Sequence, residues 1–344
     1  MKRIILSVLI LSLAASAFSL PNLVQRELFK VNKIQNIDLD LAWENIDIQE
    51  CDEPDNILVE IYCNKTKVAP EIKSFDSTIK VESNKNSLHN VNNKKCTVII
   101  RIPDSAAFEK FYLSSTSGSI HTQIVINAQK FISESTSGSQ SITKEVFAPN
   151  AKLTSTSGSI FAEAIYGETL VSNATSGSIN VQRFEGKNCS LGATSGSVKL
   201  VNADLEQVKV STTSGRIVLE GNVLQAFDIG STSGSIGLEL YKGPAKNSKI
   251  SCTSGSVFLG LPGDSNYSLA VQTTSGSFTD AISKVKMSSH VNYKGNINKG
   301  GPTIIINTTS GSITIDSTNG VSGAFSDSTV NDDVPVVSFD DPIF

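Results

Sequence analysis

Apolar side chains recur at every second position on both sides of a short polar motif that the chain repeats from its middle to its end. The motif is Thr-Ser-Gly, followed by Ser in nine of its ten copies. Apolar residues lie five and three positions before its Thr and two positions after its Gly, as Phe111, Leu113 and Ile120 do in the first copy. Alternation with a period of two is typical of β-strands. Each copy therefore predicts a strand, a tight turn and a second strand.

The spacing of the motif predicts how these units are assembled. Its copies begin at Thr116, Thr136, Thr156, Thr175, Thr194, Thr213, Thr232, Thr253, Thr274 and Thr309. A nearly constant period of about 20 residues is typical of a solenoid, in which each repeat forms one coil and buries its apolar side by stacking. We therefore predict an all-β, parallel β-helix-like solenoid of about ten coils over residues 111–316, with consecutive copies stacked. A flexible Ser/Thr/Gly linker is the alternative, but a linker has no reason to keep apolar residues in register with every glycine.

The glycine of each motif is predicted to be a structural requirement of the turn. A corner between two strands usually needs one residue at positive φ, which glycine adopts without a Cβ clash. The residue before each motif is always Ser, Ala, Thr or Cys, which suits a narrow inner corner, and stacked coils would align the Ser and Thr hydroxyls in rows. The predicted turn glycines are Gly118, Gly138, Gly158, Gly177, Gly196, Gly215, Gly234, Gly255, Gly276 and Gly311.

The start of the chain has the features of an export signal. Residues 1–17 combine Lys2 and Arg3, an apolar segment and the Ala-x-Ala-like sequence Ala15-Ser16-Ala17, which predicts a signal peptide. Nothing later resembles a transmembrane helix, so we expect an exported mature chain without a transmembrane segment. Residues 18–110 alternate like strands but lack the motif, which predicts a β-rich N-terminal cap or first coils. A separately folded domain is the alternative for this segment.

Charge and composition limit the classes of partner. The formal net charge is −4, and this slight acidity argues against nucleic-acid binding, which calls for a clustered basic face. The basic segment Lys284–Lys299 lies in the 35-residue interval before the last motif, which we interpret as one degenerate coil plus a loop. Basic runs of this kind are usually solvated loops, and a binding role is the alternative. Residues 317–344 lose the repeat and contain Asp but no Lys or Arg, which predicts an acidic flexible tail.

The five cysteines fall into two groups. Cys189 occupies a predicted core position and Cys252 a predicted inner corner, so both are expected to be buried free thiols. Cys51, Cys63 and Cys96 lie at strand ends of the non-repeated segment. Export would permit a disulfide, but three cysteines cannot all pair internally and the sequence does not select the pair. No metal-binding spacing is present among them.

No set of residues suggests catalysis. The three histidines, His89, His121 and His290, are scattered along the chain without a nucleophile–base pattern. Polysaccharide-cleaving β-helix enzymes rely on clustered carboxylates, and acidic residues do not recur at one place in the repeats that would stack them together. We therefore predict no catalytic site, no metal site and no cofactor.

Several segments carry a family resemblance. The sequence Val98-Ile99-Ile100-Arg101-Ile102-Pro103, the repeated Ser-Gly-Ser-Ile turns and the ending Gly300-Gly301-Pro302-Thr303-Ile304 resemble the bacterial putative-adhesin domain family over about residues 30–315. The resemblance implies a right-handed β-helix-like solenoid in an exported or envelope protein. It carries no catalytic residues. The family often has Asp or Asn after the glycine, whereas Ser here makes the turn face less acidic and weakens a metal-binding interpretation.

These observations favour an exported, non-catalytic, structural or adhesin-like protein in the periplasm, at the cell surface or secreted. It would present a repetitive Ser/Thr face to an envelope or extracellular polymer or protein. A self-associating envelope scaffold is the first alternative, and a polysaccharide-active β-helix enzyme is a less favoured one. An ice-binding role is disfavoured, because the rows of Thr would lie on a corner and not on a flat face.

Overall fold

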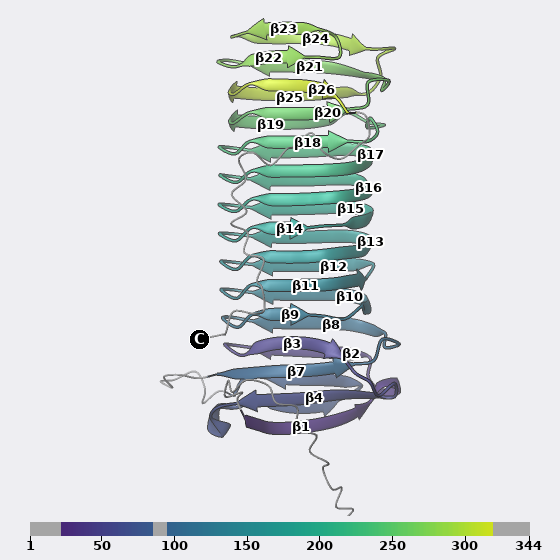
Figure 1. The fold of residues 1–344 in the computed structure, drawn as a ribbon, viewed down its shortest axis with the longest axis vertical. Coiled ribbons are helices and arrows are strands. Elements are labelled where there is room, and N and C mark those ends of the chain that lie inside the picture. Colours follow the sequence, from purple (N-terminus) through teal and green to yellow (C-terminus); the bar gives the residue numbers. More distant parts are fainter. Residues whose placement is uncertain (1–21, 85–94, 319–344) are drawn as a thin grey trace, which may run out of the picture.

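The computed structural model describes residues 22–84 and 95–318, which form one elongated stack of β-strands (Figure 1). The predicted signal peptide, His89 and residues 319–344 of the predicted tail lie outside the described residues. Apart from two short 3-10 turns, η1 (Val31–Lys33) and η2 (Thr66–Val68), the described secondary structure is β-strand. The prediction of an all-β fold built from repeated strands is confirmed.

Each Thr-Ser-Gly turn joins two strands that belong to the two faces of the stack. Around Gly118, β8 (Phe108–Ser115) leads into the turn and β9 (Ile120–Thr122) leaves it. β8 pairs in parallel with β10 (Ile126–Ser135), and β9 pairs in parallel with β11 (Gln140–Phe147). The same positions of successive motifs are therefore register partners. We call one such circuit of the chain a coil.

Two faces of stacked strands make up the molecule. In order along the stack, the first face contains β5 (Glu71–Phe75), β6 (Thr78–Glu82), β2 (Asn36–Leu41), β8, β10, β12 (Asn150–Ser155), the end of β13 (Ile160–Ala174), β15 (Phe184–Ala193), the ends of β16 (Val198–Thr212) and β17 (Ile217–Ser231), β19 (Ser248–Ser254), β25 (Thr303–Ser310), β21 (Tyr267–Thr273) and β24 (Val291–Ile297). In the same order, the second face contains β1 (Asn22–Lys30), β4 (Asn56–Cys63), β7 (Cys96–Ile102), β3 (Asn45–Glu50), β9, β11, the start of β13, β14 (Ile179–Val181), the starts of β16 and β17, β18 (Ile236–Leu240), β20 (Val257–Leu261), β26 (Ile313–Ser317), β22 (Ser277–Asp280) and β23 (Val285–Ser288).

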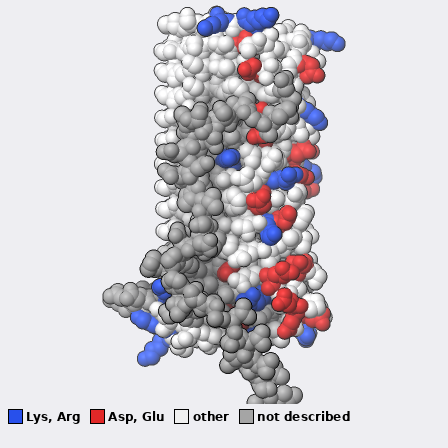
Figure 2. All heavy atoms as spheres, in the orientation of Figure 1, with Lys and Arg blue, Asp and Glu red and all other residues white. Residues whose placement is uncertain are grey.

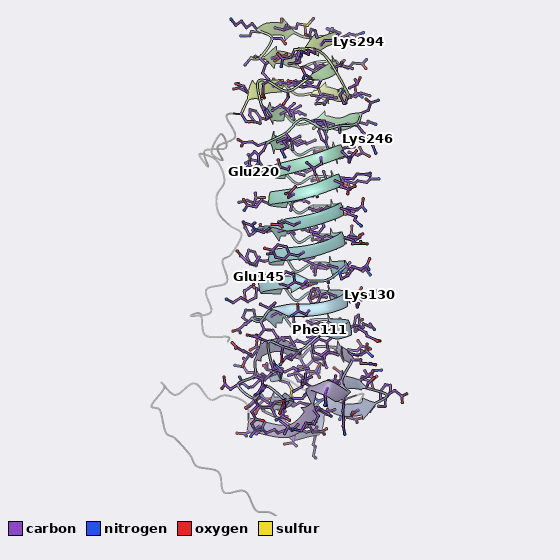
Figure 3. All side chains as sticks on the ribbon, turned by 90° about the vertical axis from the view of Figure 1, so that its right-hand side faces the viewer. Phe111, Lys130, Glu145, Glu220, Lys246 and Lys294 are labelled. Atoms are coloured by element: carbon purple, nitrogen blue, oxygen red, sulfur yellow. A yellow bond between two sulfur atoms is a disulfide. The ribbon has the colours of Figure 1, made fainter. Side chains whose placement is uncertain are left out.

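Two edges separate these faces. The Thr-Ser-Gly turns follow one another along the left-hand edge in Figure 1. Along the opposite edge the chain returns from the second face to the first, and the long strands β13, β16 and β17 bend around it. Figure 3 shows this return edge from the front.

The order of coils departs from the sequence order at both ends of the stack. The expectation that consecutive motifs always stack is wrong at the upper end, where the last two motif coils exchange places. The coil of β25 and β26 lies between that of β19 and β20 and that of β21 and β22. At the other end, the coil of β2 and β3 lies between β6 and β7 on one side and β8 and β9 on the other. All these coils have apolar side chains at the same inward positions. Any coil can therefore pack against any other with its apolar side chains in the core.

Antiparallel strands lie at the two ends of the stack. β1 pairs antiparallel with β4, and β4 with β7, at the lower end in Figure 1. At the upper end β23 and β24 pair antiparallel with β22 and β21. The interval before the last motif thus contains two strands, β23 and β24, which lie on the last coil as a degenerate coil would. The interpretation of the basic segment Lys284–Lys299 as a solvated loop is wrong over these two strands. Lys286 and Lys294 lie on these outermost strands, where charge discourages pairing with another chain.

The core is a continuous column of inward side chains between the two faces. Phe111, Phe131, Phe184, Phe227 and Phe278 are at most 2% exposed, and the rings of Phe111 and Phe131 contact each other at a centroid distance of 6.1 Å. Phe111, Phe131, Phe227 and Phe278 occupy the inward rows that alternation around the motif predicts, whereas Phe184 belongs to a further inward row, as the register partner of Ile165. Fully burying such a side chain contributes about 1.5–3 kcal/mol, so the column accounts for much of the folding free energy.

The motif glycines are required for a reason different from the predicted one. Among the described glycines only Gly221 and Gly300 have positive φ, so the positive-φ interpretation of the turn glycines is wrong. A Cβ atom on Gly138 would instead lie 1.9 Å from the carbonyl oxygen of Gly118, and one on Gly158 would lie 2.0 Å from that of Gly138. The same contact recurs along the turns, so glycine is needed because successive coils approach too closely for a side chain.

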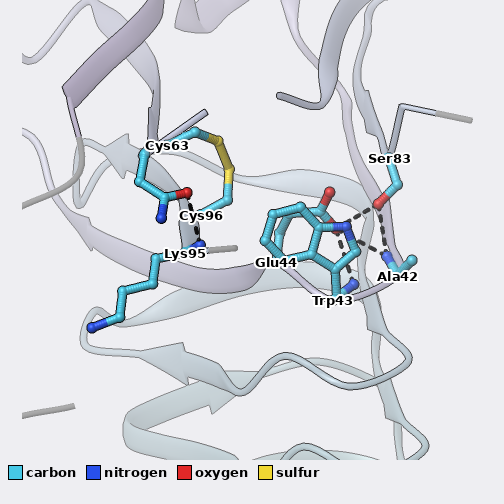
Figure 4. The surroundings of a disulfide bond; sticks show 8 residues. Ala42, Trp43, Glu44, Cys63, Ser83, Lys95 and Cys96 are labelled. Carbon is cyan, nitrogen blue, oxygen red and sulfur yellow. Dashed lines mark hydrogen bonds between the residues drawn. A yellow bond between two sulfur atoms is a disulfide. The ribbon is translucent and has the colours of Figure 1, made fainter. Parts of the chain in front are cut away.

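The non-repeated segment contains a disulfide between Cys63 and Cys96 (Figure 4). These residues are register partners on the antiparallel strands β4 and β7, with their Cα atoms 4.2 Å apart. Cys51 is a half-buried free thiol. Cys189 and Cys252 are buried and free, as the sequence predicts.

The row of turn glycines ends at Glu44, which lies in the coil next to that of Gly118. Ser117 N–H donates to Ala42 O, and Ser115 Oγ donates to Glu44 O, so residues 42–44 take the place of a Thr-Ser-Gly motif. Glu44 is fully buried, and its Oε2 accepts from Ala42 N–H (3.1 Å), Trp43 N–H (3.0 Å) and Ser83 Oγ (2.5 Å). In the Thr-Ser-Gly coils the corresponding N–H groups donate to carbonyls of the preceding coil. The Glu44 carboxylate therefore replaces those carbonyls at this end of the row of turn glycines.

Candidate functional site

The backbone of the turns is held by one repeated hydrogen bond. Ser137 N–H donates to Thr116 O, and Ser157 N–H donates to Thr136 O, both at 2.7 Å. The bond from motif Ser to the Thr of the adjacent coil continues along the stack. Because these bonds fix the backbone, the Thr and Ser side chains of the motifs lie exposed in regular rows. A solvent-facing surface of repeated hydroxyl groups results.

A second row of small side chains lines the inside of each turn. Ser115 Oγ accepts from Gly118 N–H at 2.9 Å, and Ser231 Oγ accepts from Gly234 N–H at 2.8 Å. Thr212 Oγ1 donates to Gly215 O at 2.8 Å. These contacts satisfy buried polar groups of the turn. The preference for a small residue before each motif thus reflects hydrogen bonding as well as space.

A groove runs beside the turns across several coils, with a volume of about 500 Å³. We call it the corner groove. It is lined by Ser135, Thr154, Ser155, Thr156, Asn173, Ala174, Thr175, Gly192, Ala193, Thr194, Ser211, Thr212 and Thr213. The lining contains hydroxyl groups, one carboxamide and no charged side chain. In Figure 2 the left-hand edge is correspondingly white along the middle of the stack, while charged residues gather farther to the right.

Strand register builds this groove from equivalent positions. Thr154, Asn173, Gly192 and Ser211 are consecutive register partners on the first face, two positions before their motifs. Gly192 contributes no side chain, and a Cβ there would lie 2.7 Å from Asn173 Oδ1. The groove therefore lies between an outward row of small polar residues and the row of motif threonines. Any ligand along it meets similar groups in each coil.

The structure does not assemble the histidines into a site. His121 Nδ1 lies 3.6 Å from Asp47 Oδ1, and burial lowers the pKa of His121 while the Asp47 charge opposes that shift. His290 lies in the turn between β23 and β24, where its N–H donates to Thr274 O. Within residues 22–84 and 95–318, no group of three or more His, Cys, Asp or Glu side chains is arranged to hold a metal ion. Burial raises the pKa of the Cys189 thiol, which disfavours a reactive thiolate.

One expectation about acidic residues is wrong. Glu220 on β17 and Glu239 on β18 are register partners, so two carboxylates do stack in neighbouring coils. Burial and the adjacent Glu220 charge raise the pKa of Glu239, which is 3% exposed, and Tyr241 donates a hydrogen bond to Glu220. Glu220 and Glu239 lie at the same distance after the motifs that begin at Thr213 and Thr232, and this equal spacing could have revealed the pair.

An aromatic pair on the return edge was not predicted from the sequence. Phe147 and Tyr166 are register partners on β11 and β13, and their rings stack with centroids 4.8 Å apart and planes inclined by 12°. Phe147 and Tyr166 stand at the same distance before the next motifs, which begin at Thr156 and Thr175, and this equal spacing could have revealed them. The pair is distant from the corner groove in the coil, since it lies on the opposite edge.

Comparison with known families assigns the chain to a class. The Toastrack DUF4097 family model matches residues 34–171 and 163–316, and the chain belongs to this family. The matched segments include both the non-repeated start and the motif coils. Among curated proteins, none matches the chain.

Solved structures of bacterial proteins provide further comparisons. A putative adhesin from Parabacteroides distasonis has 13% identity and a TM-score of 0.48, covering 69% of this chain and 97% of its own. A putative adhesin from Parabacteroides merdae has 12% identity and a TM-score of 0.46, covering 85% and 95%. A putative cell adhesion protein from Clostridium sporogenes has 13% identity and a TM-score of 0.22, covering 86% and 99%.

Proposed function

We propose that the chain is an exported, non-catalytic, adhesin-like protein that binds an envelope or extracellular polymer along its corner groove. In this proposal the stack is a right-handed solenoid of about ten motif coils, with antiparallel strands serving as caps. The observation that carries the proposal is the groove itself, since equivalent uncharged polar side chains from several coils line it. The adhesin names of the compared solved structures agree with this role but do not identify a ligand.

The chemistry of the groove favours a neutral, hydroxyl-rich or amide-rich polymer. Hydroxyls donate and accept hydrogen bonds, and the Asn173 carboxamide does both. A charged polymer would find no opposite charge in the lining. Each coil offers only weak contacts, but a polymer that spans several coils makes them together, and linked contacts raise the overall affinity. The length of the groove is therefore the source of binding strength.

The two alternative functions, a self-associating scaffold and a polysaccharide-cleaving enzyme, agree less well with the surface of the stack. A scaffold that polymerises end to end needs open strand edges, whereas β23 and β24 bear Lys286 and Lys294 at the upper end. A polysaccharide-cleaving enzyme would need its acids beside the bound polymer. Glu220 and Glu239 lie outside the residues that line the corner groove. Both observations favour binding along the stack.

A bulky charged substitution inside the groove tests the proposal. Thr194→Arg fills the groove, whereas Ser195→Arg changes the next exposed residue of the same turn, which does not line the groove. The purified chain is sedimented with chitin, cellulose and bacterial peptidoglycan sacculi. We expect wild type and Ser195→Arg to bind the same polymer and Thr194→Arg to lose most of that binding. Equal binding by both variants, or cleavage of the polymer by the wild-type chain, would contradict the proposal.

Within residues 22–84 and 95–318, no helix is long and apolar enough to cross a bilayer. Fractionation of intact cells, with protease added from outside, would separate the periplasmic, surface and secreted locations that the proposal leaves open.

A further inference from the structure

The return edge contains a hollow beside the stacked rings of Phe147 and Tyr166. Its volume is about 400 Å³, within the range of roughly 300–1,000 Å³ that small-molecule sites occupy. Buried Phe108, Ala128 and Ala148 form its floor. We call it the return-edge hollow. It is lined by Ala107, Phe108, Asn127, Ala128, Gln129, Phe147, Ala148, Pro149, Tyr166, Gly167 and Glu168.

The aromatic stack is open on one side. Phe147 has Tyr166 as its register partner in one neighbouring coil and Asn127 in the other. One face of the Phe147 ring packs on Tyr166, so its other face is directed toward the coil of Asn127, whose side chain is short. Phe147 is 44% exposed, an unusual position for a large apolar side chain in this stack. A flat group placed on the free face would continue the stack.

Small residues keep the space above that face empty. Ala107 and Ala128 lie where larger side chains would fill the hollow. On the other side, Gly167 cannot carry a side chain, because a Cβ there would lie 1.8 Å from Ala148 O. The hollow is therefore bounded by backbone and small side chains that have little freedom to close it. Such a preformed site loses little conformational entropy on binding.

Polar groups with little net charge surround the ring. Asn127 and Gln129 place carboxamides at the hollow. The Glu168 carboxylate accepts a hydrogen bond from Lys187 Nζ at 2.6 Å, so its charge is balanced beside the site. An apolar platform with neutral donors and acceptors around it matches a ligand with one apolar face and a polar rim.

We propose that the return-edge hollow binds a sugar ring of a neutral glycan, with the ring packed on the free face of Phe147. A pyranose ring carries C–H groups on one face, and the electron-rich face of an aromatic ring attracts them. Its equatorial hydroxyls extend sideways, toward the carboxamides of Asn127 and Gln129 and the carboxylate of Glu168. The proposal does not depend on the corner groove, which lies on the other edge of the stack.

The test uses neutral tetrasaccharides and the full chain. Binding of cellotetraose, chitotetraose and mannotetraose is measured by saturation-transfer NMR and titration calorimetry. We expect at least one to bind the wild-type chain, and Phe147→Ala and Phe147→Leu to raise its Kd by about tenfold or more, since an aromatic contact contributes up to ~1.5 kcal/mol beyond area burial. Phe147→Tyr keeps a ring and is expected to retain binding.

A matched control separates the ring from general surface apolarity. Leu224→Ala removes an exposed apolar side chain, 39% exposed, from β17 and outside the hollow, and should leave the Kd unchanged. Thermal unfolding of each variant verifies that the stack is intact. Absence of binding by all three tetrasaccharides overturns the proposal, as does an unchanged Kd in Phe147→Ala. Loss of tetrasaccharide binding in Thr194→Arg alone would also overturn it, while leaving the corner-groove function standing.

Discussion

A Cβ atom on Gly196 would lie 1.9 Å from the carbonyl oxygen of Gly177 in the adjacent coil. The atom it meets belongs to the backbone of a hydrogen-bonded turn, so the coils themselves would have to separate. We expect Gly196→Ala to destabilise the fold by about 3 kcal/mol or more, as severe overpacking does. The urea midpoint measures the loss.

Gly230 provides the matched control for this substitution. It lies on β17 in the same stack, and a Cβ there would meet no atom within 4 Å. Gly230→Ala should change the midpoint little, because neither space nor φ opposes the methyl group. Equal losses from the two substitutions would show that close approach of the coils does not explain the glycine row.

The positions of these glycines could be predicted from the sequence, but their role could not. Thr194, Ser195 and Val198 place Gly196 at a turn between two strands, and the inward rows follow from alternation alone. Positive φ was the ordinary expectation for a turn glycine. Distinguishing it from close approach requires the distance between neighbouring coils, and a single coil's sequence contains no such information.

The order of the last coils also lay beyond the sequence. Thr309 follows Thr274 in the chain, yet Ser275 N–H donates to Thr309 O and Ser254 N–H donates to Thr232 O, so the coil of Thr309 is inserted before that of Thr274. Both coils have apolar side chains in the same inward rows, with Leu269, Val271 and Phe278 in one coil and Ile304, Ile306 and Ile313 in the other. Chemically equivalent interfaces do not specify which coil lies next to which, so the repeat pattern does not give the order of these coils.

Glu44 is expected to be essential for the first turn of the stack. Glu44→Ala removes the carboxylate acceptor of Trp43 N–H, while Ala42 N–H keeps Ser83 Oγ as an acceptor at 2.7 Å. Leaving a buried donor unpaired costs about 1–3 kcal/mol, so we expect a loss of that order. Glu50→Ala, at an exposed position on β3, is the control and should be nearly neutral. Unchanged amide exchange at Trp43 in Glu44→Ala would refute the capping role.

The Cys63–Cys96 disulfide should stabilise the lower end of the stack. It closes a loop with a sequence separation of 33 residues, for which the loss of unfolded-chain entropy predicts about 3–4 kcal/mol. We expect the Cys63→Ser, Cys96→Ser double variant to lower the free energy of unfolding by that order. Cys51→Ser alters the free, half-buried thiol and should have little effect. If chemical reduction of the wild-type chain leaves its unfolding unchanged, the bond contributes no stability.

The carboxyl group of Glu82 predicts a pH-dependent contribution. Hydrogen bonds from Lys73 and Lys80 lower its pKa from 4.5 to about 2. Because the folded-state pKa lies below the unfolded one, the contribution is fully present above about pH 4.5 and is lost as the pH falls through 2. The pairs are solvent-accessible, so the effect is small. Melting temperatures of wild type and Glu82→Gln should differ at pH 7 and converge near pH 2, whereas the exposed control Glu109→Gln should show no such convergence.

The number of coils along the corner groove gives the final prediction. Ala174, Ala193 and Thr212 are successive register partners, so deleting residues 174–192 removes one coil and deleting 174–211 removes two without shifting any side chain to the other face. Both deletions retain Phe147 and Tyr166 and shorten the groove. We expect both chains to fold and to bind the polymer progressively more weakly, because each coil contributes a share of the contacts.

A deletion that breaks the register is the control for this series. Removing residues 174–212 takes out one residue more and places the following strand with its apolar side chains outward, so we expect that chain to unfold. Co-sedimentation gives the apparent Kd of each folded chain. A decline with each lost coil is the signature of a repeated binding surface. If one deletion abolishes binding completely, or two leave it unchanged, a single local site binds the polymer and the repetition serves only the fold.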